Sequence, residues 1–237
     1  MTKKHLKQRR HFHKKCSVLI AKPHNVENKT DERTNNFIMK AFERGLAEYA
    51  PIKSKLPELA RNSIIREFKT EKKYADKEHI FFLDDDSPPI DQFAIEYLRQ
   101  QNKPVACGVT PIAVVYADHI DPRWSAATKF RPDGKPDLID IWDLPKEPFK
   151  AVGVGGTCML LQRRVLEKLK PPYQRNTFDD NYEIVTFSED LYFAEKIREA
   201  GFDIWVYPEI QCHHYHNFDL LDLFASVRQT REKYEKV

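Results

Sequence analysis

The chain has 237 residues, with 39 Lys and Arg against 36 Asp and Glu, which gives a net charge of +3 at pH 7. Its 41% hydrophobic and 32% charged residues exclude collagen-like, coiled-coil and disulfide-scaffold proteins and suffice for one sizeable core. The longest apolar runs, such as 112–117, fall far short of the roughly 18 residues of a membrane-spanning helix. We therefore expect a globular protein with no integral membrane segment.

The charge is unevenly distributed. Without residues 1–15, the chain has 32 bases against 36 acids. We expect residues 1–15 to form a flexible basic tail that contacts nucleic acid phosphates, contacts anionic lipid, or only aids solubility. The apolar stretch 16–21 is too short for a signal peptide, and the four cysteines form no CxxC pair, which favours reduced thiols and a cytoplasmic location. The tail holds seven bases and no acid: Lys3, Lys4, Lys7, Arg9, Arg10, Lys14 and Lys15.

Hydrophobic periodicity and helix-boundary signals predict alternating strands and helices in the first half of the chain. Short apolar runs bounded by polar residues predict buried strands, and apolar residues at helical spacing predict amphipathic helices. The expected strands are 17–21, 79–83 and 105–108, and the expected helices are 34–49, 57–68 and 88–101.

The second half begins with a region rich in proline, aspartate and aromatics, 111–150, which predicts an antiparallel excursion. Strands are expected at 157–161, 203–207 and 210–214, helices at 163–169, 189–200 and 219–236, and a mobile loop at 170–187. The alternation of strands and helices predicts an α/β fold with a mostly parallel sheet flanked by helices. We expect one domain at 16–216, preceded by the tail and followed by a C-terminal helix at 217–237.

Asp84, Asp85 and Asp86 come directly after the apolar strand 79–83. Ligands of open α/β sheets bind outside the carboxyl ends of the strands. Clustered carboxylates repel one another unless a cation neutralises them, so three in a row favour a site for a hard metal ion. The alternative is that they only cap the turn before the next helix.

Glu189 and Asp190 begin a predicted helix. Ser188 suits an N-cap, and acids suit a first turn, so a structural role is plausible. However, Asp190 precedes Phe193, Ala194 and Ile197 by three, four and seven residues, which places it on the apolar face of the helix. A carboxylate there can act as a general base with a raised pKa.

Three histidines follow one cysteine in the stretch Cys212-His213-His214-Tyr215-His216. In a strand, Cys212, His214 and His216 would share one face. The spacing of a closed zinc site is missing, so one histidine completing the carboxylate site fits better. The alternative is a set of ordinary, partly buried histidines.

Three of the seven glycines, Gly153, Gly155 and Gly156, lie within four positions. They lack the GxGxxG spacing of a dinucleotide-binding loop. They could let the backbone approach a ligand closely, or they could simply form a turn or bulge.

Taken in order, these motifs resemble the GT-A fold glycosyltransferases, particularly the inverting family 2. The members of that family pair a DxD motif, here Asp84-Asp85-Asp86, with a later Glu-Asp at a helix start, here Glu189-Asp190. Between the two motifs they carry a small-residue segment, a strand and basic residues, which 153–169 resembles, and 205–214 resembles their late strand with a histidine. The resemblance covers residues 16–216.

The resemblance implies a metal-dependent, inverting sugar transfer from a nucleotide-sugar donor, UDP-sugar favoured, by a hexosyltransferase. Mn²⁺ or Mg²⁺ would be the cofactor. Asp86, Asp84 and His214 would form the metal site, His214 being preferred to His213. Asp190 would be the base, supported by Glu189. The nucleotide would contact Pro23, Arg61, Asn62, Asp84 and Asp85; the sugar and acceptor would contact Gly155, Gly156, Thr157, Trp124 and Trp142.

The acceptor implied by the resemblance stays open between two classes. One is a hydroxymethylated base in DNA, as in phage, with the basic tail on phosphates. The other is a glycan, with the tail touching anionic lipid if that glycan is lipid-linked. Aromatic residues of the middle region could stack on either acceptor or belong to the core.

Two rival interpretations remain. A strand ending in DxD also begins the haloacid-dehalogenase-like phosphatases, in which the first Asp is the nucleophile; here Pro88 stands where that family has threonine. The second rival is a non-catalytic module that binds a sugar nucleotide or a nucleic acid.

Overall fold

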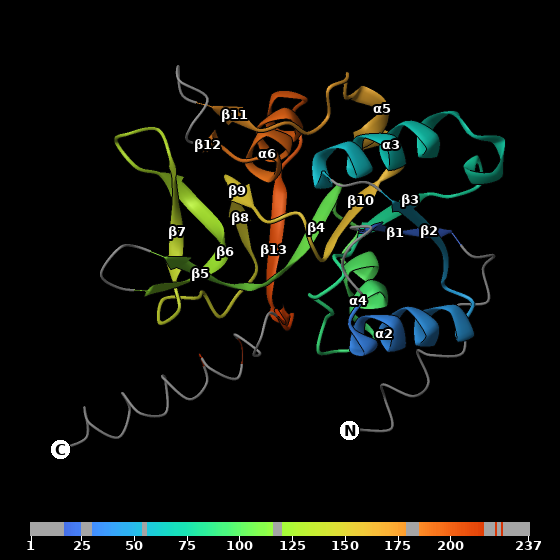
Figure 1. Ribbon diagram of the computed structural model, residues 1–237, viewed down its shortest axis with the longest axis horizontal. Helices are drawn as coiled ribbons and strands as arrows, with labels where there is room; N and C mark the ends of the chain where they lie inside the picture. The colour runs from blue at the N-terminus through green and yellow to red at the C-terminus, as the bar shows by residue number, and fades with distance from the viewer. Residues whose placement is uncertain are drawn as a thin grey trace.

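The computed structural model describes residues 17–24, 30–53, 56–115, 120–178 and 185–215, together with Leu221 and Phe224. The basic tail predicted at 1–15 and most of the helix predicted at 219–236 lie outside these residues. A seven-stranded mixed sheet runs through the described part (Figure 1) in the order β2-β1-β3-β10-β4-β13-β8. Its strands are β1 (Val18–His24), β2 (Ala47–Lys53), β3 (His79–Phe82), β4 (Val105–Val109), β8 (Phe149–Ala151), β10 (Met159–Gln162) and β13 (Ile204–Gln211).

Helices cover both faces of this sheet, as the predicted α/β class requires. On one face lie α3 (Pro57–Thr70), α5 (Arg163–Lys168) and α6 (Glu189–Glu199), and on the other lie α2 (Glu32–Glu43) and α4 (Ala94–Gln100). Successive side chains of β1 point to opposite faces of the sheet. Leu19 packs in the core on the face of α3, α5 and α6, and Ile20 packs in the core on the face of α2 and α4. Strands β10 and β8 run against the other five, so the sheet is mixed.

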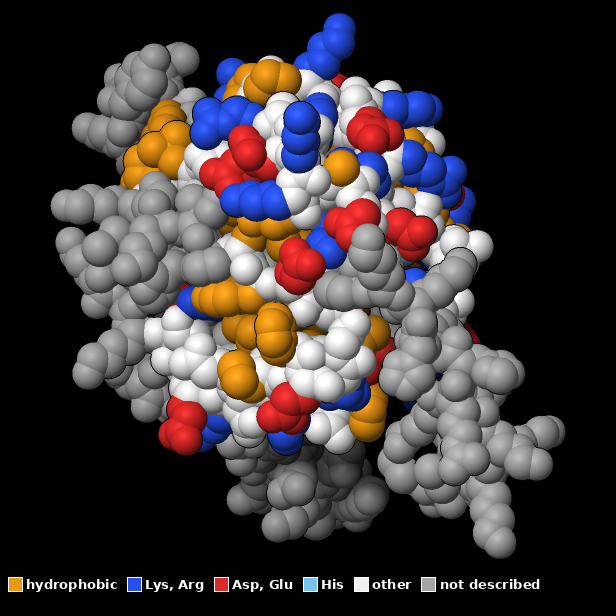
Figure 2. Space-filling model, turned by 90° about the vertical axis from the view of Figure 1, so that its right-hand side faces the viewer, with side chains coloured by type: hydrophobic (Ala, Val, Ile, Leu, Met, Phe, Trp, Pro, Cys, Tyr) orange, Lys and Arg blue, Asp and Glu red, His pale blue; other side chains and the backbone are white. Residues whose placement is uncertain are grey.

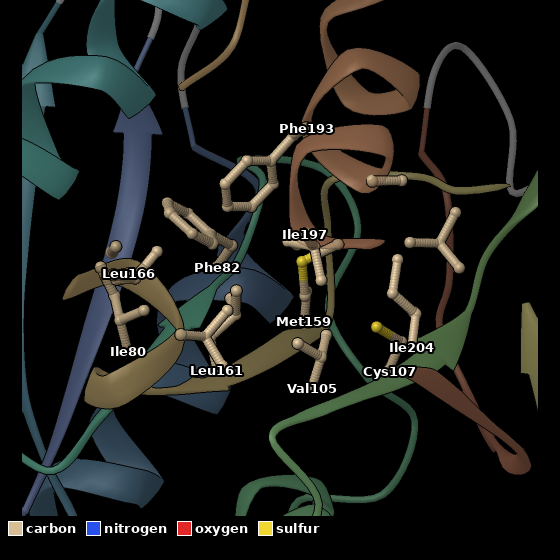
Figure 3. Close-up of a cluster of buried hydrophobic side chains, with 14 of the residues drawn as sticks. Ile80, Phe82, Val105, Cys107, Met159, Leu161, Leu166, Phe193, Ile197 and Ile204 are labelled. Atoms are coloured by element: carbon tan, nitrogen blue, oxygen red, sulfur yellow. The ribbon is translucent and has the colours of Figure 1, made fainter. Parts of the chain in front are cut away.

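The core on the α3–α6 face determines where the ends of β3 and α6 lie (Figure 3). Phe82 ends β3, and its ring meets the ring of Phe193 edge-to-face at 87° with 6.1 Å between centroids. Both side chains are fully buried, and each contributes about 1.5–3 kcal/mol by leaving water. Asp84 follows Phe82 by two residues and Asp190 precedes Phe193 by three, so this contact brings the two carboxylates to one place.

The predicted antiparallel excursion is confirmed as a second, four-stranded sheet. It contains β5 (Pro111–Val115), β6 (Ile120–Phe130), β7 (Pro136–Asp140) and β9 (Gly153–Val154). Strand β6 pairs antiparallel with each of the other three. The chain enters the main sheet at β8, rejoins the second sheet at β9, which contains Gly153, and returns to the main sheet at β10.

The helix predicted over 34–49 was wrong at its end. Helix α2 stops at Glu43, and Gly45 takes a positive φ of 66° while its N–H donates to the Phe42 carbonyl at 2.8 Å. A left-handed glycine after the last turn is a common helix stop. The residues after it form β2, an edge strand parallel to β1.

Three other boundaries differ from prediction. Helix α4 begins at Ala94 and not at Pro88, because Pro89 forms a β-bridge with Cys212. Strand β13 continues through Pro208 where two strands were expected, and its pairing with β4 shifts register there, as tolerated for proline at a bulge. The loop predicted over 170–187 contains a short antiparallel pair, β11 (Thr177–Phe178) with β12 (Val185–Phe187).

Side chains of both charges are interspersed with hydrophobic ones on the face shown in Figure 2. This mixture agrees with the near balance of acids and bases outside the tail. Among the described residues, no helix has the length and apolarity to cross a membrane.

Candidate active site at the carboxyl end of strand β3

The first residues after β3 meet the first turn of α6 and the second turn of α3. Arg61, on α3, points its guanidinium between the two other segments, and its side chain is only 4% exposed. The Nη2 group donates to Asp84 Oδ1 at 2.7 Å, Nη1 donates to Asp190 Oδ1, and Nη1 lies 3.6 Å from Glu189 Oε1. The structure thus unites both acidic motifs around one buried cation, although they are about a hundred residues apart.

The charges of this cluster shift one another's pKa values. Burial lowers the pKa of Arg61, but the carboxylates of Asp190, Asp84 and Glu189 raise it more, so it ends above its usual value. Burial raises the pKa of Asp190, and Asp84 adds to the rise, while Arg61 and the Gly156 amide partly offset it. Burial and the charge of Asp190 raise the pKa of Glu189. Asp190 therefore has the raised pKa expected of a general base.

The glycine cluster packs against these carboxylates. A Cβ on Gly156 would lie 2.6 Å from Arg61 Cζ and would also collide with Asp190 Oδ1. The next residue, Thr157, accepts a hydrogen bond at Oγ1 from the Asp84 backbone amide at 3.1 Å. Gly156 is therefore needed for the approach of Arg61 and Asp190, a reason that the sequence analysis did not foresee.

Asp85 turns away from Asp84 and contacts Lys22 at the end of β1. Its Oδ1 accepts hydrogen bonds from Lys22 Nζ and from Thr30 Oγ1, the latter at 2.8 Å. The Lys22 side chain is 1% exposed and that of Asp85 15% exposed. Asp85, expected at the nucleotide, forms a buried ion pair that fixes the turn to β1.

Asp86 and His214, two of the expected metal ligands, lie close together. His214 Nε2 lies 3.9 Å from Asp86 Oδ2, and His214 Nδ1 lies 2.8 Å from the Pro111 carbonyl oxygen. A hydrogen bond from Nδ1–H to that carbonyl leaves the Nε2 lone pair facing Asp86, which is the usual orientation of a metal-ligating histidine. Ser87 Oγ donates to the other Asp86 oxygen at 2.8 Å.

The predicted third metal ligand, Asp84, is turned toward Arg61. Accordingly, within the described residues no group of three or more His, Cys, Asp and Glu side chains has the geometry of a metal site. Asp86 and His214 nevertheless offer one carboxylate oxygen and one imidazole nitrogen, a donor set that suits Mn²⁺. A bound cation would need further oxygen ligands from water or from a substrate.

Strand β13 ends at Gln211, so the strand predicted over 210–214, in which Cys212 and His214 would share one face, was wrong after that residue. Cys212 is fully buried in the bridge to Pro89. The ring of His213 stacks on Tyr215 with 5.0 Å between centroids. His216 lies outside the described residues.

Two of the expected nucleotide contacts have structural roles. Asn62 Oδ1 accepts from the amides of Tyr173 and Gln174 at 2.8 and 3.0 Å, and Nδ2 donates to the carbonyls of Glu58 and Gln174. These four bonds use the hydrogen-bonding capacity of the side-chain amide, and through them Asn62 anchors the segment after α5. Pro23 is buried within β1 and pairs with Ile52.

Of the expected acceptor residues, some are buried in the core and others are exposed. Trp124 is 0% exposed and its Nε1–H donates to the Ile141 carbonyl at 3.3 Å, which corrects its prediction as a stacking surface: it belongs to the core. Trp142 is 36% exposed. The Gly155 amide donates to the Ser125 carbonyl at 2.8 Å, which fixes the turn on β6.

Sequence reasoning missed three residues that hold the site. Lys22 could have been singled out, because it directly follows the apolar run 17–21. Thr30, which donates to Asp85, gave no local signal. Asn176 Oδ1 accepts from the Glu189 amide at 3.0 Å and caps α6 in place of Ser188, which makes no side-chain cap bond.

No family model matches the chain, and no curated protein matches it either. Among solved structures, A197 from STIV is similar with a TM-score of 0.54 at 20% identity, over 84% of this chain and 85% of that chain. The inositol-1-phosphate CTP transferase from T. maritima gives a TM-score of 0.40 at 11% identity, over 82% and 86% of the two chains. The likeness to A197 indicates a shared fold.

Proposed function

We propose that this chain is a GT-A fold glycosyltransferase that moves a sugar from a nucleotide-sugar donor to an acceptor hydroxyl with inversion. The observation that carries the proposal is the meeting of Asp190, a partly buried carboxylate of raised pKa, with the turn of Asp84–Asp86 at the carboxyl end of β3. A base and a cation-binding carboxylate at one sheet edge are what such a transfer needs.

The proposed reaction is a single displacement at the anomeric carbon. The acceptor oxygen forms a bond to that carbon as the bond from the carbon to the diphosphate oxygen breaks. The bonding electron pair leaves with the nucleoside diphosphate, and the acceptor proton passes to the Asp190 carboxylate. Glu189, on the same helix turn, supports the negative field that favours this proton transfer.

Asp86 and His214 are the residues that would hold a divalent cation, Mn²⁺ or Mg²⁺. Such an ion neutralises charge on a departing diphosphate. In this assignment, Asp84 belongs to the Arg61 cluster and supports the base, in place of the metal and nucleotide contacts that the family resemblance implied.

The acceptor that we propose is either a hydroxymethylated base in DNA or a glycan. The exposed Trp142 offers a ring that could stack on a base or a sugar. The phosphatase alternative has less support, because its nucleophile would be Asp84, whose Oδ1 is held by Arg61.

The test is a panel of nucleotide sugars with hydroxymethylated DNA and glycan acceptors, read by mass spectrometry, with Mn²⁺, with Mg²⁺ and with chelator. We expect the mass of one sugar on an acceptor, or free sugar and nucleoside diphosphate, only when metal is present. Release of inorganic phosphate from phosphomonoesters without use of any nucleotide sugar would favour the phosphatase instead.

A further inference from the structure

Arg61 combines burial and charge in a way that a stabilising contact alone does not explain. It is the cation at the centre of three carboxylates from two other elements, and its side chain is 4% exposed. Burying ions requires compensating contacts, and hydrophobic side chains of similar volume often stabilise as well or better. The cluster therefore points to a requirement on the position of the carboxylates themselves.

The guanidinium is also poorly accessible to a ligand, because its side chain is 4% exposed and its Nε, which has no hydrogen-bond partner among the described residues, is fully buried. Both terminal nitrogens are committed to carboxylates, Nη1 to Asp190 and Nη2 to Asp84, and the Gly156 turn lies directly against the Cζ atom. A donor phosphate would have to displace a carboxylate to reach it. The expected nucleotide contact at Arg61 is thus replaced by contacts within the site.

We infer that Arg61 is a positioning residue, which holds the Asp190 carboxylate in one orientation and fixes it to Asp84 of the β3 turn. The planar fork of arginine suits this role, because two nitrogens at fixed spacing engage two carboxylates at once. A base on α6 and a turn after β3 are then held as one unit, with Gly156 supplying the room. This inference rests on the proposed transfer reaction.

The experiment compares Arg61→Met and Arg61→Lys with a matched control, Arg163→Met. Arg163 also packs against α3, but its guanidinium donates to the backbone carbonyls of Lys77, Phe68 and Tyr74 and to no site carboxylate. We expect kcat to fall about 100- to 1000-fold in Arg61→Met, with partial rescue in Arg61→Lys, because misplacing a reacting group costs about 100-fold. Donor KM should stay within about threefold.

A double-mutant cycle tests whether Arg61 acts through Asp190. If it does, Arg61→Met should lower the residual kcat of Asp190→Asn only slightly, because the base that it positions is already gone. A loss in that background as large as in wild type would overturn the inference. So would a tenfold rise of donor KM at unchanged kcat, or an Arg61→Met profile equal to that of Arg163→Met.

Gly156→Ala is the second variant, which keeps the charge of Arg61 and serves if Arg61→Met does not fold. Its Cβ would push apart the pair of Arg61 and Asp190, so kcat should fall while donor KM holds; full activity would overturn the inference. Wild-type protein is assayed first with the nucleotide-sugar panel. No turnover there would refute the proposed function, whereas turnover with unaffected variants would refute only the role of Arg61.

Discussion

The two ends of strand β3 differ in the charge state of their titratable side chains. At the amino end, burial lowers the pKa of His79 to about 4, helped by Arg99, so the imidazole is neutral at pH 7. At the carboxyl end, three consecutive aspartates follow the strand, and buried cations from two other elements hold the first two. The first residue of the strand is thus a neutral titratable group, whereas the residues after the strand form a cluster of ions.

The contrast separates a structural end from a candidate functional one. A neutral histidine avoids burial of a charge, although His79 Nδ1 is buried without a hydrogen-bond partner among the described residues. The partly buried carboxylates of Asp84 and Asp85 instead have Arg61 and Lys22 as partners. Asp86 differs from both neighbours, because it faces an imidazole and a hydroxyl. Each variant below alters one end of β3 or a group that it contacts, and the variants run from the largest expected effect to the smallest.

Asp190→Asn tests the charged end most directly. Loss of a general base should lower kcat by about 100- to 10,000-fold, with donor binding retained. The base works ionised, so wild-type activity should fall as pH drops through a pKa above the usual range of aspartate, because burial raises it. Steady-state kinetics against pH measure both. Glu199→Gln, exposed at the other end of α6, is the control, and equal effects from the two would refute the assignment.

Lys22→Met breaks the buried pair with Asp85. Removing one partner of such a pair should lower the free energy of unfolding by about 3–5 kcal/mol, because the carboxylate loses its cation. Urea unfolding measures this loss. The double variant Lys22→Met/Asp85→Asn should recover much of it, and a double variant as unstable as the single one would show that the pair is not the cause.

His79→Gln tests the neutral end of β3. The unfolded chain takes up a proton on His79 below about pH 6.5, while the folded chain resists it down to about pH 4. Wild-type stability should therefore fall as pH drops through that window, by at most about 3 kcal/mol. The variant has no proton to bind there, so its unfolding free energy should vary less with pH. Identical pH dependence in the two proteins would contradict the neutral histidine.

His214→Asn tests the Asp86 side of the turn. If His214 ligates the cation, the metal concentration for half-maximal activity should rise by about 10- to 100-fold. His213→Asn is the matched control, since that ring stacks on Tyr215 and should leave the metal dependence unchanged. A larger shift for His213 than for His214 would reverse the assignment of the ligand.

Local signals in the sequence were enough to predict the α/β class, the antiparallel middle region and most elements. Periodicity and caps depend on neighbouring residues, which is why α3 and α6 matched prediction well. Edge strand β2 was missed because Leu46 and Tyr49 continue the helical spacing of α2. The stop signal was Gly45.

The sequence indicated which residues could carry the chemistry of the site, but not which of them contact one another. The acidic motifs stood out, whereas the bond from Arg61 to Asp190 spans 129 residues, and no local pattern encodes such a contact. Trp124 and Asn62 show the same limit of local sequence, because the residue type alone does not tell whether an aromatic ring or an amide faces a ligand or the interior. Burial decided the role of Trp124, and hydrogen bonds to residues distant in sequence decided that of Asn62.

The tight fit at Gly156 has an evolutionary consequence. A Cβ at that position would lie 2.6 Å from Arg61 Cζ, so no larger residue is compatible with the present cluster. Among relatives of this chain, residues 61, 156 and 190 should therefore change together or not at all. A lineage that substituted the glycine would have to lose the arginine as well, and with it the fixed geometry of the carboxylates.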